Sequence, residues 1–392
     1  IVKKGKIWLG HLIIEVLVLL SMGAMLFWPV QGGSYRRFAN DMLSYVRGTV
    51  EEILSEELSD STVGSGQKLG LQTLAVRLPD GQTVEIDNYL TEMHNVYARP
   101  GQRVIVCVDA PEGVTPYYSI YNYDRTPGLM ALGGVFLLLM LLVGGRKGFD
   151  AFMAIGFTVL FLIQVALPKI FCGGNPVLVG FSVVFLSTAV TLLLLHGPTL
   201  SCLLGACVTL LGEIAACLLF WGFSHILHLT GFQTESAEDL LLIAQNTGLQ
   251  VRTLLHTGTM IASLGAVMDV AVSILSSLRE VARAEQTPST RGLFRSGMNI
   301  GRDMIGTMGN TLIFAFTGGA LATMLVFYSY GVHFHQLLSS DYLTLELTQG
   351  LCSTAAVILT VPAAALVAAC IYPRVISNGR RKVLPETRPE SK

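Results

Sequence analysis

Charged side chains are scarce in this chain of 392 residues. They make up 14% of it, whereas soluble domains hold about a quarter, and hydrophobic residues reach 52%. The formal net charge is −1 and the charges avoid the long apolar runs, so neither a nucleic-acid surface nor an acidic tail is expected. This composition predicts a polytopic membrane protein whose partners include the membrane lipid.

The sequence also lacks the motifs of several enzyme and metal-site classes. Its seven cysteines form no CxxC pair and no Cys/His zinc spacing, and most lie in apolar runs, which argues against a disulfide framework. There is no P-loop, no GxSG, no HExxH and no GxGD motif. An intramembrane aspartyl protease is therefore a weak alternative. We predict no enzyme activity, no cofactor and no metal site, and we interpret the histidines of the outer loops as interfacial.

Long apolar runs are the main feature of the chain. A run of about 20 residues spans ~30 Å of hydrocarbon as a helix. Such runs fall at roughly 8–28, 129–145, 150–169, 176–195, 199–223, 253–278, 305–330 and 348–372. We predict a mostly α-helical membrane bundle of about eight transmembrane helices, in which the first run is an uncleaved anchor.

The distribution of Lys and Arg predicts the orientation, because basic residues near helix ends resist translocation. One set of connections holds nearly all of them: Lys3, Lys4, Lys6, Arg146, Lys147, Arg279, Arg283, Arg291, Arg295, Arg302 and the basic residues of 374–392. The other set holds almost none. Both termini are therefore predicted to be cytoplasmic, with residues 31–126 extracytoplasmic.

The segment between the first two runs has a β pattern. TLAVRLPDGQTVEIDN (73–88) alternates apolar and polar residues around Asp80-Gly81, as a hairpin does, and GQRVIVCVDA (101–110) supplies another strand. We predict a small β-rich domain, either OB-like or a sandwich barrel, preceded by a helix near 36–58. The predicted domains are the N-terminus and anchor (1–30), the β-rich domain (31–126), a seven-helix transmembrane domain (127–372) and a basic cytoplasmic tail (373–392).

Three carboxylates lie inside the apolar runs. Glu15 is in the first, one turn after His11, Glu213 is near the middle of the fifth, and Asp269 is in the sixth. A carboxylate near the bilayer centre costs at least about 2.5–3.5 kcal/mol on insertion scales, so each one needs a partner, a proton or a cation. For Glu15 and Glu213 a functional and a structural role remain equally open.

Asp269 belongs to a polar stripe. Asp269, Ser273 and Ser276 share one helix face, and Asn299, Asp303, Gly306 or Thr307, and Asn310 repeat this spacing on the next segment. Arg302 points to another side, so Asp303 is predicted to face the bundle with Asp269. These oxygens suit protons, Na⁺ or another hard cation. Alternatively, the polar groups only hydrogen-bond helices together, at about 0.6 kcal/mol each.

Glycines accompany the second half of this stripe. Gly297 and Gly301 form a GxxxG pattern, and Gly306 and Gly309 follow. Small residues at this spacing let a neighbouring helix approach closely. The same glycines would instead permit a bend whose freed backbone groups line a cavity.

LGAVMDVAVSILSSL (264–278) and LFRSGMNIGRDMIGTMGNTLIFAF (293–316) resemble the signature region of the YibE/F-like family of bacterial multi-pass membrane proteins. The layout is similar to the longer, YibE-type members, which have an extracytoplasmic domain. The resemblance implies a bacterial cytoplasmic membrane location and a smaller polytopic partner of the same family. It implies no established activity, but the residues that match its pattern are those noted above: Asp269, Ser273, Asn299, Arg302, Asp303 and Asn310.

The leading functional hypothesis is a transporter or permease of unknown substrate, coupled to protons or Na⁺ through intramembrane carboxylates. Asp269 and Asp303 would share or exchange a cation while movement at Gly301 to Gly309 opens one side. The alternative is a membrane scaffold or sensor whose extracytoplasmic domain binds a partner or an envelope component.

Overall fold

The computed structural model describes residues 2–27, 42–62, 66–111, 113–234, 236–285 and 289–381. The chain forms two compact units. One consists of Ile1–Tyr35 with Val143–Lys392, and the other of Arg36–Leu142. The first is helical and is called the helical unit below; the second holds all the described strands and is called the β unit. The end of the predicted tail, 382–392, lies outside the described residues.

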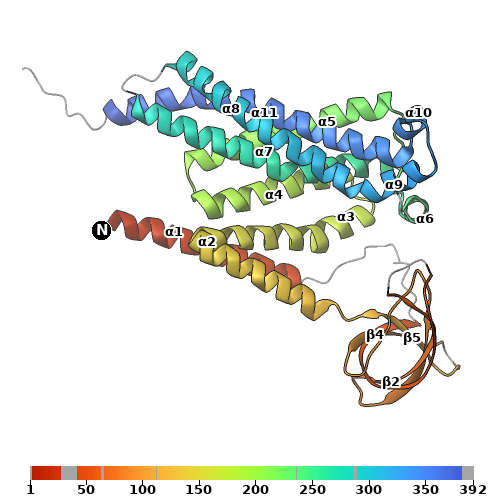
Figure 1. The fold of residues 1–392 in the computed structure, drawn as a ribbon. Coiled ribbons are helices and arrows are strands. Elements are labelled where there is room, and N and C mark those ends of the chain that lie inside the picture. The colour runs from red at the N-terminus through yellow and green to blue at the C-terminus, as the bar shows by residue number, and fades with distance from the viewer. Residues whose placement is uncertain are drawn as a thin grey trace, which may run out of the picture. The chain divides into compact units, whose positions relative to one another are not determined.

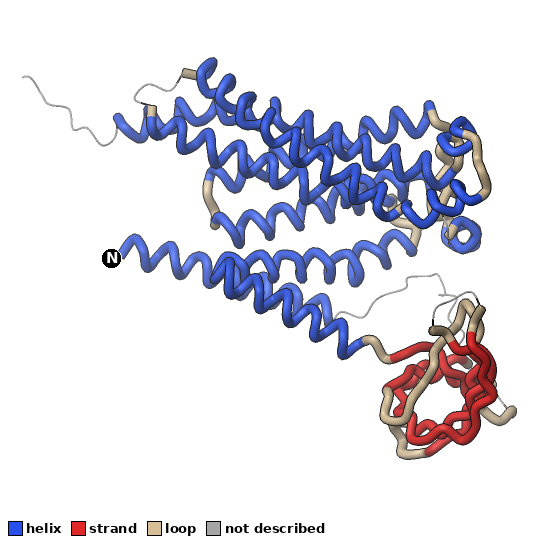
Figure 2. Tube along the Cα trace, in the orientation of Figure 1, coloured by secondary structure: helices blue, strands red, loops and turns tan. Residues whose placement is uncertain are grey.

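The β unit is built on one antiparallel sheet. Its strands are β1 (Leu43–Asp60), β2 (Lys68–Arg77), β3 (Thr83–Leu90), β4 (Arg103–Asp109) and β5 (Tyr117–Tyr123), in the order β3-β2-β1-β4-β5. The long β1 pairs with β4 through its first part and with β2 through its second. The strands curl round on themselves (Figures 1 and 2). The described strands therefore form one curled sheet and not the two stacked sheets of a sandwich.

Alternating side chains fill the inside of this sheet. Leu74 and Val76 of β2, Ile86 of β3, and Val104 and Val106 of β4 are at most 1% exposed. They occupy every second position, because successive side chains of a strand point to opposite faces. The predicted hairpin is confirmed: β2 and β3 pair across a turn that contains Gly81, at φ 87°.

The helix predicted near 36–58 is wrong over the residues that the structure describes, since Leu43–Asp60 is strand β1. Its second half is rich in Glu and Leu, which favour a helix locally, but pairing with β2 along this half overrides that preference. The strand pattern is also concealed. Register shifts between Val50 and Glu52 and between Ile53 and Ser55 interrupt the alternation that begins at Val46.

The helical unit contains most of the helices. The helices of the chain are α1 (Val2–Phe27), α2 (Thr126–Phe161), which continues through the π-helical segment η1 (Leu162–Ala166) into α3 (Leu167–Phe171), α4 (Pro176–His196), α5 (Leu200–Ile226), α6 (Ala237–Thr247), α7 (Val251–Ala284), α8 (Thr290–Gly319), α9 (Leu321–Ser329), α10 (Phe334–Leu338) and α11 (Asp341–Arg381). The chain is thus mostly helical, as predicted.

Among the described residues, six helical stretches are long and apolar enough to cross a membrane, or seven if the bent pair α8 and α9 forms one span. The sequence predicted about eight. The difference lies in Thr126–Phe171, whose 46 residues include two predicted runs. At ~1.5 Å per residue, 46 helical residues amount to about 69 Å of helix, enough to cross the hydrocarbon twice. Gly145 interrupts it with non-helical dihedrals, φ 56° and ψ −134°.

Helix α7 packs against α4, α5, α8 and α11 and forms the centre of the helical unit (Figure 1). Its residues Val267, Ala271 and Ile274 are completely buried. The facing helix α11 contributes small residues, including Ala364 and Ala368, which are also completely buried. Small side chains allow helix axes to approach closely in a membrane. Helix α11, which also packs against α5 and α8, therefore shares the centre of the unit with α7.

Asp124 fixes the connection between β5 and α2 within the β unit. Its Oδ1 accepts a hydrogen bond from the Thr126 amide at 3.1 Å, and its Oδ2 lies 3.5 Å from Arg47 Nε. Hydrogen bonds from Thr126, the hydroxyl foremost, and the charge of Arg47 hold the pKa of Asp124 below its ordinary value. Ionised Asp124 therefore stabilises this connection above about pH 4, and the stabilisation is lost as the pH falls through the lowered pKa of Asp124.

We expect hydrogen exchange of the amides at the start of α2 to become faster in acid. The rate in wild type, divided by the rate in Asp124→Asn at the same pH, should rise as the pH is lowered below about 4, because the asparagine does not titrate. A ratio that stays constant with pH would show that Asp124 does not control this connection.

Candidate functional site

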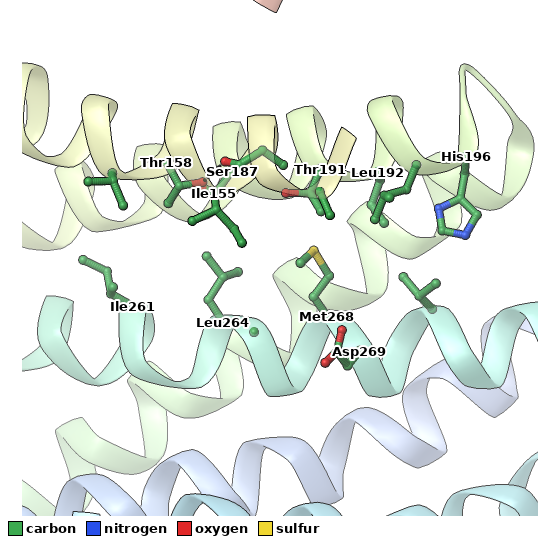
Figure 3. Close-up of a pocket in the computed structure, with 16 residues that line it drawn as sticks. Ile155, Thr158, Ser187, Thr191, Leu192, His196, Ile261, Leu264, Met268 and Asp269 are labelled. Atoms are coloured by element: carbon green, nitrogen blue, oxygen red, sulfur yellow. Dashed lines mark hydrogen bonds between the residues drawn. The ribbon is translucent and has the colours of Figure 1, made fainter. Parts of the chain in front are cut away.

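A cavity of about 520 Å³ lies between α2, α4 and α7 of the helical unit (Figure 3). Its wall is mostly apolar, with residues such as Ile155 of α2, Leu192 of α4 and Leu264 of α7. Binding sites for small molecules typically have this size and an apolar lining with a few polar groups. The cavity is therefore the candidate functional site, and its chemistry depends on the polar side chains in its wall.

Besides one carboxylate, four polar residues line the cavity. They are Thr158 of α2 and Ser187, Thr191 and His196 of α4. The Thr158 hydroxyl donates to the carbonyl of Ala154 at 3.0 Å, so its own helix satisfies it. Ser187 is 3% exposed, and its Oγ has no hydrogen-bond partner within the described chain. Ser187 is therefore a buried hydrogen-bonding group at the wall of the cavity that the described chain leaves unpaired.

Asp269 is the only carboxylate among the residues that line this cavity. It is more than a third exposed, since the neighbouring Val267, Val270 and Ala271 take the buried side of α7. In Figure 3, Asp269 lies in the half of the cavity that ends at His196. No hydrogen bond or ion pair to Asp269 is present within the described parts of the chain. Its oxygens are free to bind a cation or the polar group of a substrate.

The other predicted α7 residues do not line the cavity. Ser273, one turn beyond Asp269, is half-buried. Ser276 is exposed, and its hydroxyl donates to the Ser273 carbonyl at 3.1 Å. Serine hydroxyls in membrane helices commonly bond to their own backbone in this way. Of the predicted face, Asp269 alone combines a charge with a position at the cavity.

The α8 half of the predicted stripe lies elsewhere. Asn299, Arg302, Asp303 and Asn310 are all exposed, and Arg302 Nη1 lies 3.5 Å from Asn299 Oδ1. In the described chain no hydrogen bond or ion pair joins Asp303 to Asp269. The structure thus places Asp269 at the cavity with α2 and α4, and leaves Asp303 on the exposed side of α8.

The glycines of α8 serve close packing. A Cβ at Gly297 would lie 2.8 Å from both Ala365 Cβ and Leu278 Cδ1, and one at Gly301 would overlap the side chain of Val361. Gly309 is also buried, but nothing lies within 4 Å of a Cβ built at Gly306. Helix α8 is continuous through all four glycines, and the 56° bend follows its end at Gly319. Of the two predicted roles, the structure favours close approach over a bend.

Glu213 of α5 is a second intramolecular polar centre and, unlike Asp269, it is buried. It is completely buried, and its Oε2 accepts a hydrogen bond from Ser263 of α7 at 2.8 Å. Its Oε1 has no partner within the described chain. A carboxylate oxygen without a donor in apolar surroundings costs free energy. Glu213 was a candidate site residue in the sequence analysis, whereas Ser263 was not. The residue spacing in α5 and α7 does not indicate that these two side chains contact each other across the helices.

Sequence reasoning also missed Ser187, Thr191 and His196 of α4 and Thr158 of α2. Serine and threonine are common inside membrane helices, so these hydroxyls gave no signal until the packing showed that they share a cavity. His196 ends α4 directly before Gly197. Its second role, as a wall of the cavity, follows only from the structure.

The model of the family described as YibE/F-like protein matches residues 132–374, which is more than half of the chain. No curated protein and no solved structure was found to match the chain. The matched range contains every segment that lines the cavity and also Glu213, Ser263 and the packed glycines of α8. It begins beyond the strands of the β unit and beyond α1.

Proposed function

Since this chain belongs to the YibE/F-like family, and since Asp269 lies in the wall of a large cavity, we propose that it is a multi-pass membrane transporter or permease. Transport is coupled to protons or Na⁺ through the intramembrane carboxylates Asp269 and Glu213, and the substrate is a small molecule or ion. A carboxylate that faces a cavity between apolar helices is what such coupling requires.

In this proposal α2 is the movable wall of the cavity. Its lining residues fall between 151 and 159. This segment lies between two irregularities, the break at Gly145 and the π-helical segment Leu162–Ala166. Irregular turns of this kind let a helix bend and often occur at functional sites. Binding at Asp269 would then favour one position of α2, and release would favour the other.

The proposed location is the bacterial cytoplasmic membrane, with both termini cytoplasmic and residues 31–126 outside. The uneven distribution of Lys and Arg supports this orientation. The order β3-β2-β1-β4-β5, in which a long β1 pairs with both β2 and β4, supports an OB-like β-rich domain. We also propose a smaller polytopic partner of the same family.

Ligand-dependent stability of the purified full chain tests the coupling site. A cation that binds the folded state alone stabilises it by about 2.7 kcal/mol at 100 times Kd. We expect wild type to melt at a higher temperature in Na⁺ than in choline at equal ionic strength, or to show a pH-dependent melting temperature. Asp269→Asn should remove this response.

Asp303→Asn is the matched control, because Asp303 is an exposed carboxylate of the same type on α8. It should retain the response of wild type. A response that disappears in Asp303→Asn and persists in Asp269→Asn would move the site from the cavity to α8. A wild type that responds neither to Na⁺ nor to pH would contradict cation coupling.

One observation favours the alternative of a scaffold or sensor. Tyr45, Tyr117 and Tyr121 of the β unit are each more than half exposed, and the rings of Tyr45 and Tyr121 meet edge to face at 4.9 Å. Exposed aromatic groups often mark binding surfaces. Under this alternative, removing residues 42–123 abolishes function while Asp269→Asn does not. Under the transport proposal, the single substitution Asp269→Asn is sufficient to abolish function.

A further inference from the structure

A separate cluster of titratable side chains joins α1 to α2 within the helical unit. His11 and Glu15 lie one turn apart on α1, and Asp150 lies on α2. One ring nitrogen of His11 and one carboxylate oxygen from each of the other two all lie within 4.8 Å of one another. Atoms that share a metal ion at about 2.1 Å are roughly 3.4 Å apart, so shifts of about 1 Å would bring these three onto one ion.

Asp150 supplies an independent sign that a ligand is missing. Its side chain is almost completely buried, with 3% of the residue exposed. Its Oδ1 has no hydrogen-bond partner within the described chain. Buried carboxylate oxygens are nearly always paired, and burial of an unpaired charge is costly. A cation beside His11 and Glu15 would satisfy this carboxylate.

Arg146 holds Glu15 in place. Its Nε and Nη2 donate to the same Glu15 oxygen, Oε1, at 3.1 and 2.5 Å. Both bonds end on one oxygen, so the other oxygen of Glu15 is available to a cation. Carboxylates that bind metals are commonly oriented by such hydrogen bonds. With Glu15 and Asp150 ionised and His11 neutral, the three side chains and Arg146 carry a charge of −1, which leaves the site attractive to a divalent cation.

We propose that His11, Glu15 and Asp150 bind one divalent transition-metal cation. An imidazole nitrogen with two carboxylate oxygens suits Zn²⁺, Mn²⁺ or Fe²⁺, whereas Mg²⁺ and Ca²⁺ prefer oxygen ligands alone. The site goes beyond the proposed transport and does not depend on it, because none of the three residues lines the cavity.

The bound cation would fasten α1 to the rest of the helical unit. Of the side chains described in α1, those of residues 10–27, half are exposed, and Val18 is the one among them that is buried. The cluster is also close to one end of the cavity. His11 Nε2 lies 3.0 Å from where a Cβ on Gly197 would be, and the neighbouring His196 lines the cavity, as does Ala151 beside Asp150. Occupancy would therefore stiffen the end of the cavity.

Metal binding by the full chain tests the proposal. The protein is purified in detergent, stripped with a chelator, incubated with Zn²⁺ or Mn²⁺ and desalted, and its metal content and melting temperature are then measured. We expect about one metal ion per chain and a melting temperature that rises with metal concentration. Asp150→Asn and His11→Gln should each weaken binding by more than about 10-fold, because losing even an outer-shell partner of a metal ligand typically costs 10- to 100-fold.

Two further variants separate the possible outcomes. Glu280→Gln removes an exposed carboxylate of α7 and should bind metal like wild type. Asp269→Asn should also retain the metal, so that a failed coupling site and a failed metal site are distinguished. Wild type that holds no more metal than Asp150→Asn overturns the proposal. So does a stability that depends on pH but not on metal, since the two carboxylates would then share a proton.

Discussion

Substituting Gly301 by alanine is expected to destabilise the helical unit by about 1–3 kcal/mol, the usual cost of overpacking. The added methyl group would overlap Val361 of α11, whose Cβ and Cγ2 would lie 3.1 and 3.2 Å away. The side chain of Val361 is completely buried and cannot move aside without disturbing its neighbours. Unfolding of the purified protein in mixed detergent, followed by circular dichroism, measures this loss.

Gly306→Ala is the matched control on the same helix. Nothing lies within 4 Å of the added Cβ, and alanine favours a helix over glycine by roughly 0.5–1 kcal/mol. This variant should be as stable as wild type or slightly more stable. If both variants lose stability equally, the glycines act through a bend that alanine suppresses, and the close packing of α8 on α11 is not their role.

Replacing Glu213 by leucine is expected to stabilise the helical unit by about 1–3 kcal/mol, the cost of a poorly satisfied buried polar group. Leucine removes the unpaired Oε1 and places apolar atoms in this buried site. Ser263 keeps its hydrogen bonds to the carbonyls of Thr259 and Met260, at 3.0 and 3.2 Å, so its hydroxyl is not left unpaired. A gain in stability would mean that the carboxyl is maintained at the expense of the fold, as functional groups often are.

The double-mutant cycle with Ser263→Ala isolates the contact between the two residues. Ser263→Ala alone should destabilise by about 1–3 kcal/mol, because it removes the one described hydrogen bond to Glu213. In the Glu213→Leu background the same change should be nearly neutral. If Glu213→Leu itself destabilises the protein, Glu213 is a structural link between α5 and α7, and its place in the coupling proposal is lost.

The sequence predicted those features that composition and periodicity determine. Apolar runs located the candidate spans, and the alternation around Asp80-Gly81 located the hairpin of β2 and β3. It failed at β1, where the Glu-rich second half has helical propensity and two register shifts conceal the strand. Local helical preference is a weak guide where a segment pairs with a neighbouring strand, as this half of β1 pairs with β2.

The candidate site could be predicted only in part. Asp269 and Glu213 can be recognised from the sequence alone, because carboxylates inside apolar runs are energetically costly and rare. Their partners do not. Ser187 and Ser263 are ordinary residues for a membrane helix, and only the packing of α4, α5 and α7 shows what they face. The spacing of Asp303 was equally suggestive, yet its side of α8 is exposed.

The limits of the family match have a consequence for the modular construction of the protein. Every wall of the cavity lies within 132–374, whereas His11 and Glu15 precede that range and Asp150 falls inside it. A homologue that began at α2 would keep the whole cavity and lose two of the three proposed metal ligands. The cavity therefore lies entirely within the range that the family model covers, and the proposed metal site depends in addition on α1, which precedes that range.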